Sequence, residues 1–123
     1  MKKVYYNKLV RDTIKAKIEN VGEACSVRVI TDSNEFEQEL FKKVVEEATA
    51  LAHVRTRHEF LNEYADLMVV LDALTAKLEI SEADLQVALT ENVAKKGLFK
   101  NQHFLEWSED SEYKSNETPQ GLK

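Results

Sequence analysis

The sequence predicts a mainly α-helical protein, a small helical bundle with one short β element that assembles as an oligomer. Glycine occurs three times and proline once in 123 residues, and so few helix breakers over this length favour long helices. Apolar residues recur at the spacing of an amphipathic helix in four segments, against one short alternating stretch. A chain this short buries only a modest core, so helices with wide apolar faces favour association between copies.

The first expected helix begins near Val10, because Val10, Ile14 and Ile18 fall on one helical face before Gly22 ends the segment. Residues 25–30 read Cys-Ser-Val-Arg-Val-Ile, and this alternation of apolar and polar residues is typical of a short β-strand. The β element of the predicted fold therefore lies between the first helix and the second.

Two long helices are expected next, over about residues 34–53 and about residues 57–78, and we expect them to pack antiparallel. Asp32 followed by Glu35 resembles a capping box at the start of the earlier helix. Both segments carry apolar residues at helical spacing. They form the centre of the predicted bundle.

A fourth helix is expected from Ser81, because Ser81 with Asp84 is typical of an N-terminal cap. It ends near Gly97, which follows two lysines, and both features are typical of helix C-termini. The last residues are polar and show no period. We therefore expect a helical domain over residues 1–107 and a mobile tail over residues 108–123.

The composition narrows the choice of partner and compartment. The formal net charge is -5, which argues against nucleic acid as a partner, since that would require a basic surface. The single Cys25 cannot form an intrachain disulfide and fits a reducing compartment. The chain has neither the apolar run of a membrane span nor that of a secretory signal. We expect a cytoplasmic protein without a membrane partner.

Carboxylates fall on the apolar faces of both long helices. Glu47 lies within the stripe that runs from Phe36 to Leu51, and Glu63 lies in the middle of the stripe of the next helix, with Asp66 on its edge. A carboxylate in a helix–helix seam is costly unless it is paired. Acids on two facing helices therefore favour a bound divalent cation, Mg²⁺ or Mn²⁺. The plain alternative is that water, helix ends or basic side chains satisfy these acids.

Several short stretches together resemble a known family. They are residues 6–12 (Tyr-Asn-Lys-Leu-Val-Arg-Asp), 43–48 (Lys-Val-Val-Glu-Glu-Ala), 63–67 (Glu-Tyr-Ala-Asp-Leu), 70–74 (Val-Leu-Asp-Ala-Leu) and 95–99 (Lys-Lys-Gly-Leu-Phe). In this order they resemble the MazG-like, phosphoribosyl-ATP-pyrophosphohydrolase-like superfamily of all-α nucleoside triphosphate pyrophosphatases. The likeness spans roughly residues 5–107. It implies a MazG-like helical bundle.

The resemblance implies a metal-dependent reaction that splits a nucleoside triphosphate into a monophosphate and pyrophosphate, as in the house-cleaning of non-standard nucleotides. The family motif is Glu-Glu-x-x-Glu, a spacer, and Glu-x-x-Asp. The resemblance assigns the catalytic and metal-binding roles to Glu46, Glu47, Glu63 and Asp66. The chain departs from the motif at the last Glu of its first half, Glu-Glu-x-x-Glu, where it has Ala50. Three neighbours on the same helical flanks offer local replacement: Glu46, His53 and Glu59.

Phosphoryl chemistry also requires positive charge and hydrogen-bond donors around the phosphates. The candidates for substrate binding are Lys8, Arg11, Asn92, Lys95 and Lys96. The plain alternative for each cation is a solvated surface position or a partner for a helix C-terminus.

The expected partners are a nucleoside triphosphate or related nucleotide and further copies of the chain, as a homodimer or tetramer. Apolar residues beyond the main stripe, among them Phe41, Val45, Met68 and Val69, favour the oligomer. Two other functions stay open: a degenerate relative that binds nucleotide or metal without efficient turnover, and a structural or interaction helix bundle.

Overall fold

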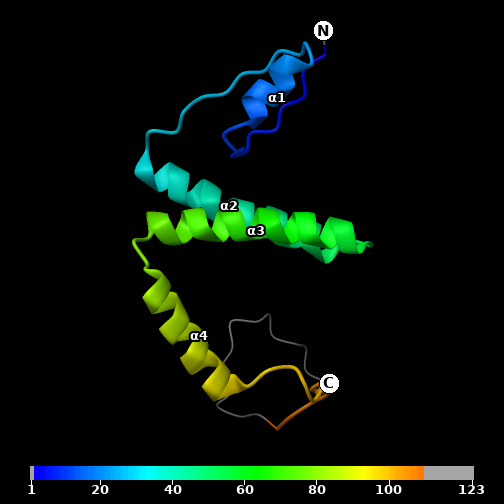
Figure 1. The fold of residues 1–123 in the computed structure, drawn as a ribbon, viewed down its shortest axis with the longest axis vertical. Helices are drawn as coiled ribbons and strands as arrows, with labels where there is room; N and C mark the ends of the chain where they lie inside the picture. Colours follow the sequence, from blue (N-terminus) through cyan, green and yellow to red (C-terminus); the bar gives the residue numbers. More distant parts are fainter. Residues whose placement is uncertain (1, 110–123) are drawn as a thin grey trace. The chain divides into compact units, whose positions relative to one another are not determined.

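The computed structural model describes residues 2–109, and these residues contain four helices and no β-strand. The helices are α1 (Ile14–Asn20), α2 (Ser33–Ala52), α3 (Arg57–Lys77) and α4 (Glu82–Lys96) (Figure 1). The prediction of a mainly α-helical protein is confirmed. No helix in this part of the chain combines the length and the apolar character needed to cross a membrane.

The chain divides into two compact units, residues 1–86 and residues 87–123. The first unit holds α1, α2, α3 and the beginning of α4, and the second holds the rest of α4 and the segment after it. The predicted tail over residues 108–123 lies outside the described residues except for its first two positions. The domain boundary expected there stays a prediction.

Side-chain caps fix where the long helices begin. The Asp32 carboxylate accepts hydrogen bonds from the backbone N–H groups of Asn34 and Glu35, at 2.8 and 3.1 Å. The Thr56 hydroxyl accepts one from the backbone N–H of Glu59 at 3.1 Å. Each cap satisfies backbone donors that have no partner within the helix. The predicted cap at Asp32 is confirmed, but the Glu35 carboxylate, the other half of the predicted capping box, binds Arg28 instead.

The start and end of α4 also follow the predicted chemistry. The backbone N–H of Asp84 donates to the Ser81 hydroxyl at 3.1 Å, and the helix runs from Glu82 to Lys96. Gly97 follows with a φ of 76°, a left-handed conformation that glycine adopts without the steric penalty of a side chain. This stop is where the sequence places it.

The α2 and α3 helices pack side by side and run antiparallel, joined by a short turn over residues 53–56 (Figure 1). The buried apolar residues of the described chain all belong to this hairpin: Leu40, Val70 and Leu74. The predicted antiparallel pairing is confirmed. The hairpin core is thin, so the two helices have extensive exposed flanks.

The predicted strand over residues 25–30 is wrong for the structure described. These residues form neither helix nor strand. A strand requires a neighbouring strand for its backbone hydrogen bonds, and alternation in the sequence does not supply one. The segment is held instead by the Arg28 guanidinium, which binds the Glu35 carboxylate of α2 through two hydrogen bonds. The first helix is also shorter than expected, because α1 begins at Ile14 rather than near Val10.

Candidate metal centre

Three carboxylates meet where α2 and α3 face one another. Glu47 of α2 and Glu63 and Asp66 of α3 each offer one oxygen, and these oxygens lie within 4.8 Å of one another. All three residues are half-buried. We refer to Glu47, Glu63 and Asp66 as the acidic cluster. A group of oxygen ligands this close can hold a metal ion.

The helical period and the antiparallel pairing together build this cluster. Residues three apart lie on one face of a helix, which brings Glu63 and Asp66 to the same side of α3. Glu47 lies on the flank of α2 that faces α3, one and a half to two turns beyond the buried Leu40. The three carboxylates therefore converge as an extension of the apolar seam.

Burial and the neighbouring negative charges both raise the pKa of the Glu63 carboxyl. Partial burial raises the pKa of the Glu63 carboxyl above its ordinary value of 4.5, and the negative charges of Asp66 and Glu47 raise it further. A hydrogen bond with Asp66 and the charge of Glu59 act in the same direction. A divalent cation would offset this concentration of negative charge.

Basic side chains border the acidic cluster. The Lys43 ammonium lies 3.5 Å from a Glu47 oxygen, and the Arg11 guanidinium lies 3.6 Å from an Asp66 oxygen. Lys43 is the least exposed of these cations, with 11% of its side chain accessible, whereas Arg11 retains 54%. The structure therefore brings the predicted substrate-binding Arg11 to the cluster, and it adds Lys43, which sequence reasoning did not single out.

The role of Lys43 was detectable in principle from its position. It precedes Glu47 by four residues, the spacing at which oppositely charged side chains pair on a helix. Lys43 also lies on the same flank of α2 as Glu46 and close to the acidic cluster. Its mostly covered side chain is consistent with a structural counter-charge for the acids.

Glu46 lies beside the cluster rather than within it. One of its oxygens accepts a hydrogen bond from the Lys8 ammonium at 3.0 Å, and the other accepts one from Lys43 at 3.2 Å. Partial burial alone would raise the pKa of Glu46, but the hydrogen bonds from Lys8 and Lys43 outweigh it and leave that pKa below its ordinary value. Glu46 therefore fastens the N-terminal segment to α2, and Lys8 reaches the margin of the site.

The predicted replacements for the missing carboxylate at Ala50 have other partners. The His53 ring nitrogen Nδ1 lies 2.7 Å from the backbone oxygen of Thr49. A Glu59 oxygen accepts a hydrogen bond from the backbone N–H of Arg55 at 3.0 Å. Together with the pairing of Glu46, these contacts leave three carboxylates, not four, in the cluster.

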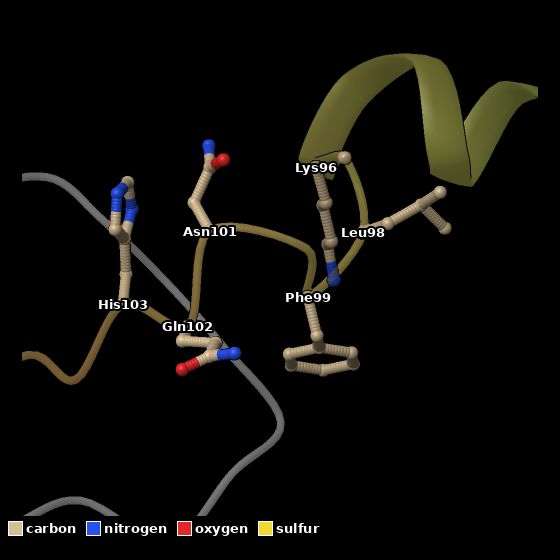
Figure 2. A pocket seen from close by; sticks show the side chains of 7 residues that line it. Lys96, Leu98, Phe99, Asn101, Gln102 and His103 are labelled. Carbon is tan, nitrogen blue, oxygen red and sulfur yellow. The ribbon is translucent and has the colours of Figure 1, made fainter.

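The remaining predicted site residues, Asn92, Lys95 and Lys96, belong to the second unit. Lys96 lines a shallow pocket with residues 97–99 and 101–103 (Figure 2). Figure 2 shows that the side chains of Asn101 and His103 extend away from those of Phe99 and Gln102, so they do not converge on one point. The side chains that line this pocket are not arranged around a common ligand position. The substrate-binding roles of Asn92, Lys95 and Lys96 stay predictions.

Comparison with protein-family models, with curated proteins and with solved structures found no match for this chain. The observations define a protein whose described part is all-α, with four helices and an acidic cluster able to hold a metal ion. Membership of the MazG-like superfamily stays a prediction based on the sequence motifs.

Proposed function

We propose that this protein is a metal-dependent nucleotide pyrophosphohydrolase that converts a nucleoside triphosphate into a monophosphate and pyrophosphate. The observation that supports it most is the approach of the Glu47, Glu63 and Asp66 oxygens to within 4.8 Å of one another, on two different helices. The sequence motifs that carry these residues resemble those of the MazG-like superfamily. These three residues are among the four to which the resemblance assigns the metal-binding role; the fourth, Glu46, lies beside the cluster.

The donor set suits a hard cation. All three ligands are carboxylate oxygens, which Mg²⁺ and Mn²⁺ prefer over softer donors. A bound divalent ion would polarise phosphate oxygens and lower the pKa of a bound water. The acidic chain would otherwise repel a triphosphate, since its formal net charge is -5. A cation at the cluster would remove that conflict.

Different residues of the chain would then bind the metal ion, bind the phosphate groups and position the basic side chains. Glu47, Glu63 and Asp66 would hold the ion. Lys8 and Arg11, at the margin of the acidic cluster, would offer positive charge to the phosphate groups, where such charge is most effective when it is fixed in advance. Glu46 would act as a positioning residue, because it binds Lys8 through a hydrogen bond of 3.0 Å.

A nucleotide panel tests this proposal. The protein is incubated with standard and non-standard nucleoside triphosphates in the presence of Mg²⁺ or Mn²⁺, and pyrophosphate release is measured. We expect release that requires the metal and that Glu63→Gln abolishes. Glu39→Gln is the matched control, because Glu39 lies on α2 and pairs with Lys42 rather than with the cluster. Equal release by the parent and Glu63→Gln would contradict the proposal.

A second candidate function is metal or nucleotide binding without efficient turnover. The observation that favours it is the absence of a fourth carboxylate in the cluster, since Ala50 replaces one acid and Glu46 is bound to two lysines. A ligand that binds only the folded state raises its stability. Thermal stabilisation by Mn²⁺ and nucleotide without pyrophosphate release would select this function. No stabilisation by either ligand would select the structural helix bundle.

A further inference from the structure

An exposed aromatic ring lies in the N-terminal segment next to Lys8. The Lys8 ammonium lies over the ring of Tyr6, 5.7 Å from the ring centroid. A cation at this distance is attracted to the face of an aromatic ring. Tyr6 remains 68% exposed, so the contact with Lys8 leaves much of the ring accessible to a ligand.

The backbone between these two residues has an uncommon conformation. Asn7 has a φ of 48°, in the left-handed region that residues other than glycine rarely adopt, although asparagine adopts it more readily than most. Asn7 separates Tyr6 from Lys8 in the chain, so its conformation sets how the ring and the ammonium face each other. Backbone conformations of this kind are concentrated at functional sites.

A series of ionic contacts connects this ring to the acidic cluster. The Lys8 ammonium donates a hydrogen bond to one Glu46 oxygen at 3.0 Å, and the other Glu46 oxygen accepts one from Lys43 at 3.2 Å. The Lys43 ammonium in turn lies 3.5 Å from a Glu47 oxygen. Lys8 therefore stands between the acidic cluster and Tyr6. A ligand that meets Lys8 with its phosphates can meet Tyr6 with the group that the phosphates carry.

Core packing does not account for the position of Tyr6. Aromatic side chains stabilise a fold chiefly by burying their large apolar surface, whereas Tyr6 stays largely exposed. The neighbouring Tyr5 is 77% exposed, and among residues 2–109 a cation lies over the ring of Tyr6 but not over that of Tyr5. The two adjacent tyrosines therefore differ in their relation to Lys8, which makes Tyr5 a matched control.

We propose that Tyr6 binds the base of the nucleotide by stacking, an inference that rests on the proposed function for the identity of the ligand. Every nucleobase has a π-face, so stacking on an aromatic side chain adds affinity with little choice among bases. Tyr6 holds the base while Lys8, beside it, meets the phosphates. A site of this kind accepts nucleotides with different bases.

The test compares ligands that have a base with one that lacks it. The ligands are adenine and uracil nucleoside triphosphate analogues with a methylene group between the α- and β-phosphates, which cannot be split there, and inorganic tripolyphosphate. Each is titrated with Mn²⁺ into the full chain and its variants by calorimetry. We expect Tyr6→Ala to weaken binding of both analogues by about tenfold and to leave tripolyphosphate binding unchanged. Tyr6→Phe, which keeps the π-face, and Tyr5→Ala should bind all three ligands as the parent does.

A second variant keeps the test decisive where Tyr6→Ala does not fold, as judged by circular dichroism. Tyr6→Leu retains an apolar side chain of substantial size but has no π-face, and it should weaken binding of the two analogues alone. Equal affinity of the parent and a folded Tyr6→Ala or Tyr6→Leu for the analogues overturns the proposal. An equal loss for tripolyphosphate also overturns it, because Tyr6 would then act through Lys8 on the phosphates rather than on the base.

Pyrophosphate release from cleavable nucleotides separates this proposal from the proposed function. Binding of the analogues that depends on Tyr6, without release by the parent, supports the role of Tyr6 and contradicts the hydrolase. Metal-dependent release with the same KM in the parent and Tyr6→Ala supports the hydrolase and overturns the role of Tyr6. A parent chain that neither binds the analogues nor releases pyrophosphate overturns both.

Discussion

The two sides of the α2–α3 hairpin differ in what completes them. One side of the hairpin carries Lys43, Glu46 and Asp66 beside the seam that holds Glu47 and Glu63, and Lys8 and Arg11 of the N-terminal segment pair with Glu46 and Asp66 on that side. The opposite side has an accessible surface built of Phe41, Val45, Tyr64 and their neighbours. One side requires positive charge and the other requires apolar surface. A hairpin with so few buried residues can therefore depend on what binds its two sides as well as on the packing between its two helices.

The largest loss of stability should come from a substitution in the buried seam between α2 and α3. Leu74 is 7% exposed and is one of the few buried residues of the described chain. We expect Leu74→Ala to lower the free energy of unfolding by about 3 kcal/mol, through lost burial and the cavity left behind. Urea unfolding measures it. Leu98→Ala is the control, because Leu98 is 62% exposed; equal losses for both variants would mean that Leu74 is not part of the core.

The next effect concerns the acid of the family motif that Ala50 replaces. Ala50 is half-buried on the flank of α2 that carries Glu46 and Glu47. We expect Ala50→Glu to tighten Mn²⁺ binding by about tenfold and to increase pyrophosphate release, because it restores an oxygen ligand. Calorimetric titration and the nucleotide assay measure the two effects. Ala50→Gln, similar in size but neutral, is the control; a variant that folds yet gains in neither assay would show that position 50 does not face the cluster.

A pH-dependent effect should distinguish the acidic cluster from ordinary surface acids. The folded state raises the pKa of Glu63 above its ordinary value of 4.5, chiefly through partial burial and then through the charges of Asp66 and Glu47. A folded state that binds the proton more tightly loses stability as the pH rises. Without metal, the contribution of Glu63 is therefore fully present below its ordinary pKa and is lost as the pH rises through the raised value.

The comparison of the parent with Glu63→Gln isolates this contribution. Glu35 and Glu46 have pKa values lowered in the folded state, so they act in the opposite direction and lose stability on acidification, but they are present in both proteins. In metal-free buffer we expect Glu63→Gln to be more stable than the parent at pH 7 and the difference to shrink on acidification. Thermal unfolding across pH 4 to 8 measures it. A constant difference would contradict the raised pKa.

The smallest effect should come from Arg11, which links the N-terminal segment to the cluster. Its guanidinium lies 3.6 Å from Asp66, and both side chains are about half exposed, so the ion pair contributes less than about 1 kcal/mol to stability. We expect Arg11→Ala to tighten Mn²⁺ binding roughly two- to threefold, since a competing cation is removed. Lys15→Ala is the control, because Lys15 pairs with Glu19. Weaker binding by Arg11→Ala would mean that Arg11 does not compete with the ion.

Capping chemistry in the sequence was sufficient to predict where α2 and α4 begin, and helical periodicity was sufficient to predict the acidic cluster. Asp32 and Ser81 predict helix starts because their side chains can accept hydrogen bonds from backbone N–H groups of the first turn. Both side chains accept such a hydrogen bond in the structure. The positions of Glu47 and Glu63 on apolar stripes predicted that the two acids would meet. The caps depend on residues within one helical turn, and the meeting of the acids follows from helical periodicity together with the antiparallel pairing of two helices joined by a short turn.

The features that sequence reasoning missed depend on partners distant in the chain. Residues 25–30 alternate like a strand, but the described residues contain no strand to pair with them. Glu46 was assigned to the metal, yet Lys8, 38 residues away, takes one of its oxygens. Helical period alone does not tell which cation will reach which acid, since that depends on the path of the segment before α1.

The central claim is that Glu47, Glu63 and Asp66 bind a divalent metal ion. The most direct test is to titrate Mn²⁺ into the full chain and into Glu63→Gln and to measure binding by isothermal calorimetry. We predict that the parent binds the ion, that the neutral variant Glu63→Gln binds it at least about tenfold more weakly, and that Glu39→Gln binds it as the parent does. Circular dichroism of each protein establishes that the helices are intact. Equal affinity of the parent and a folded Glu63→Gln would show that Glu47, Glu63 and Asp66 do not form a metal centre.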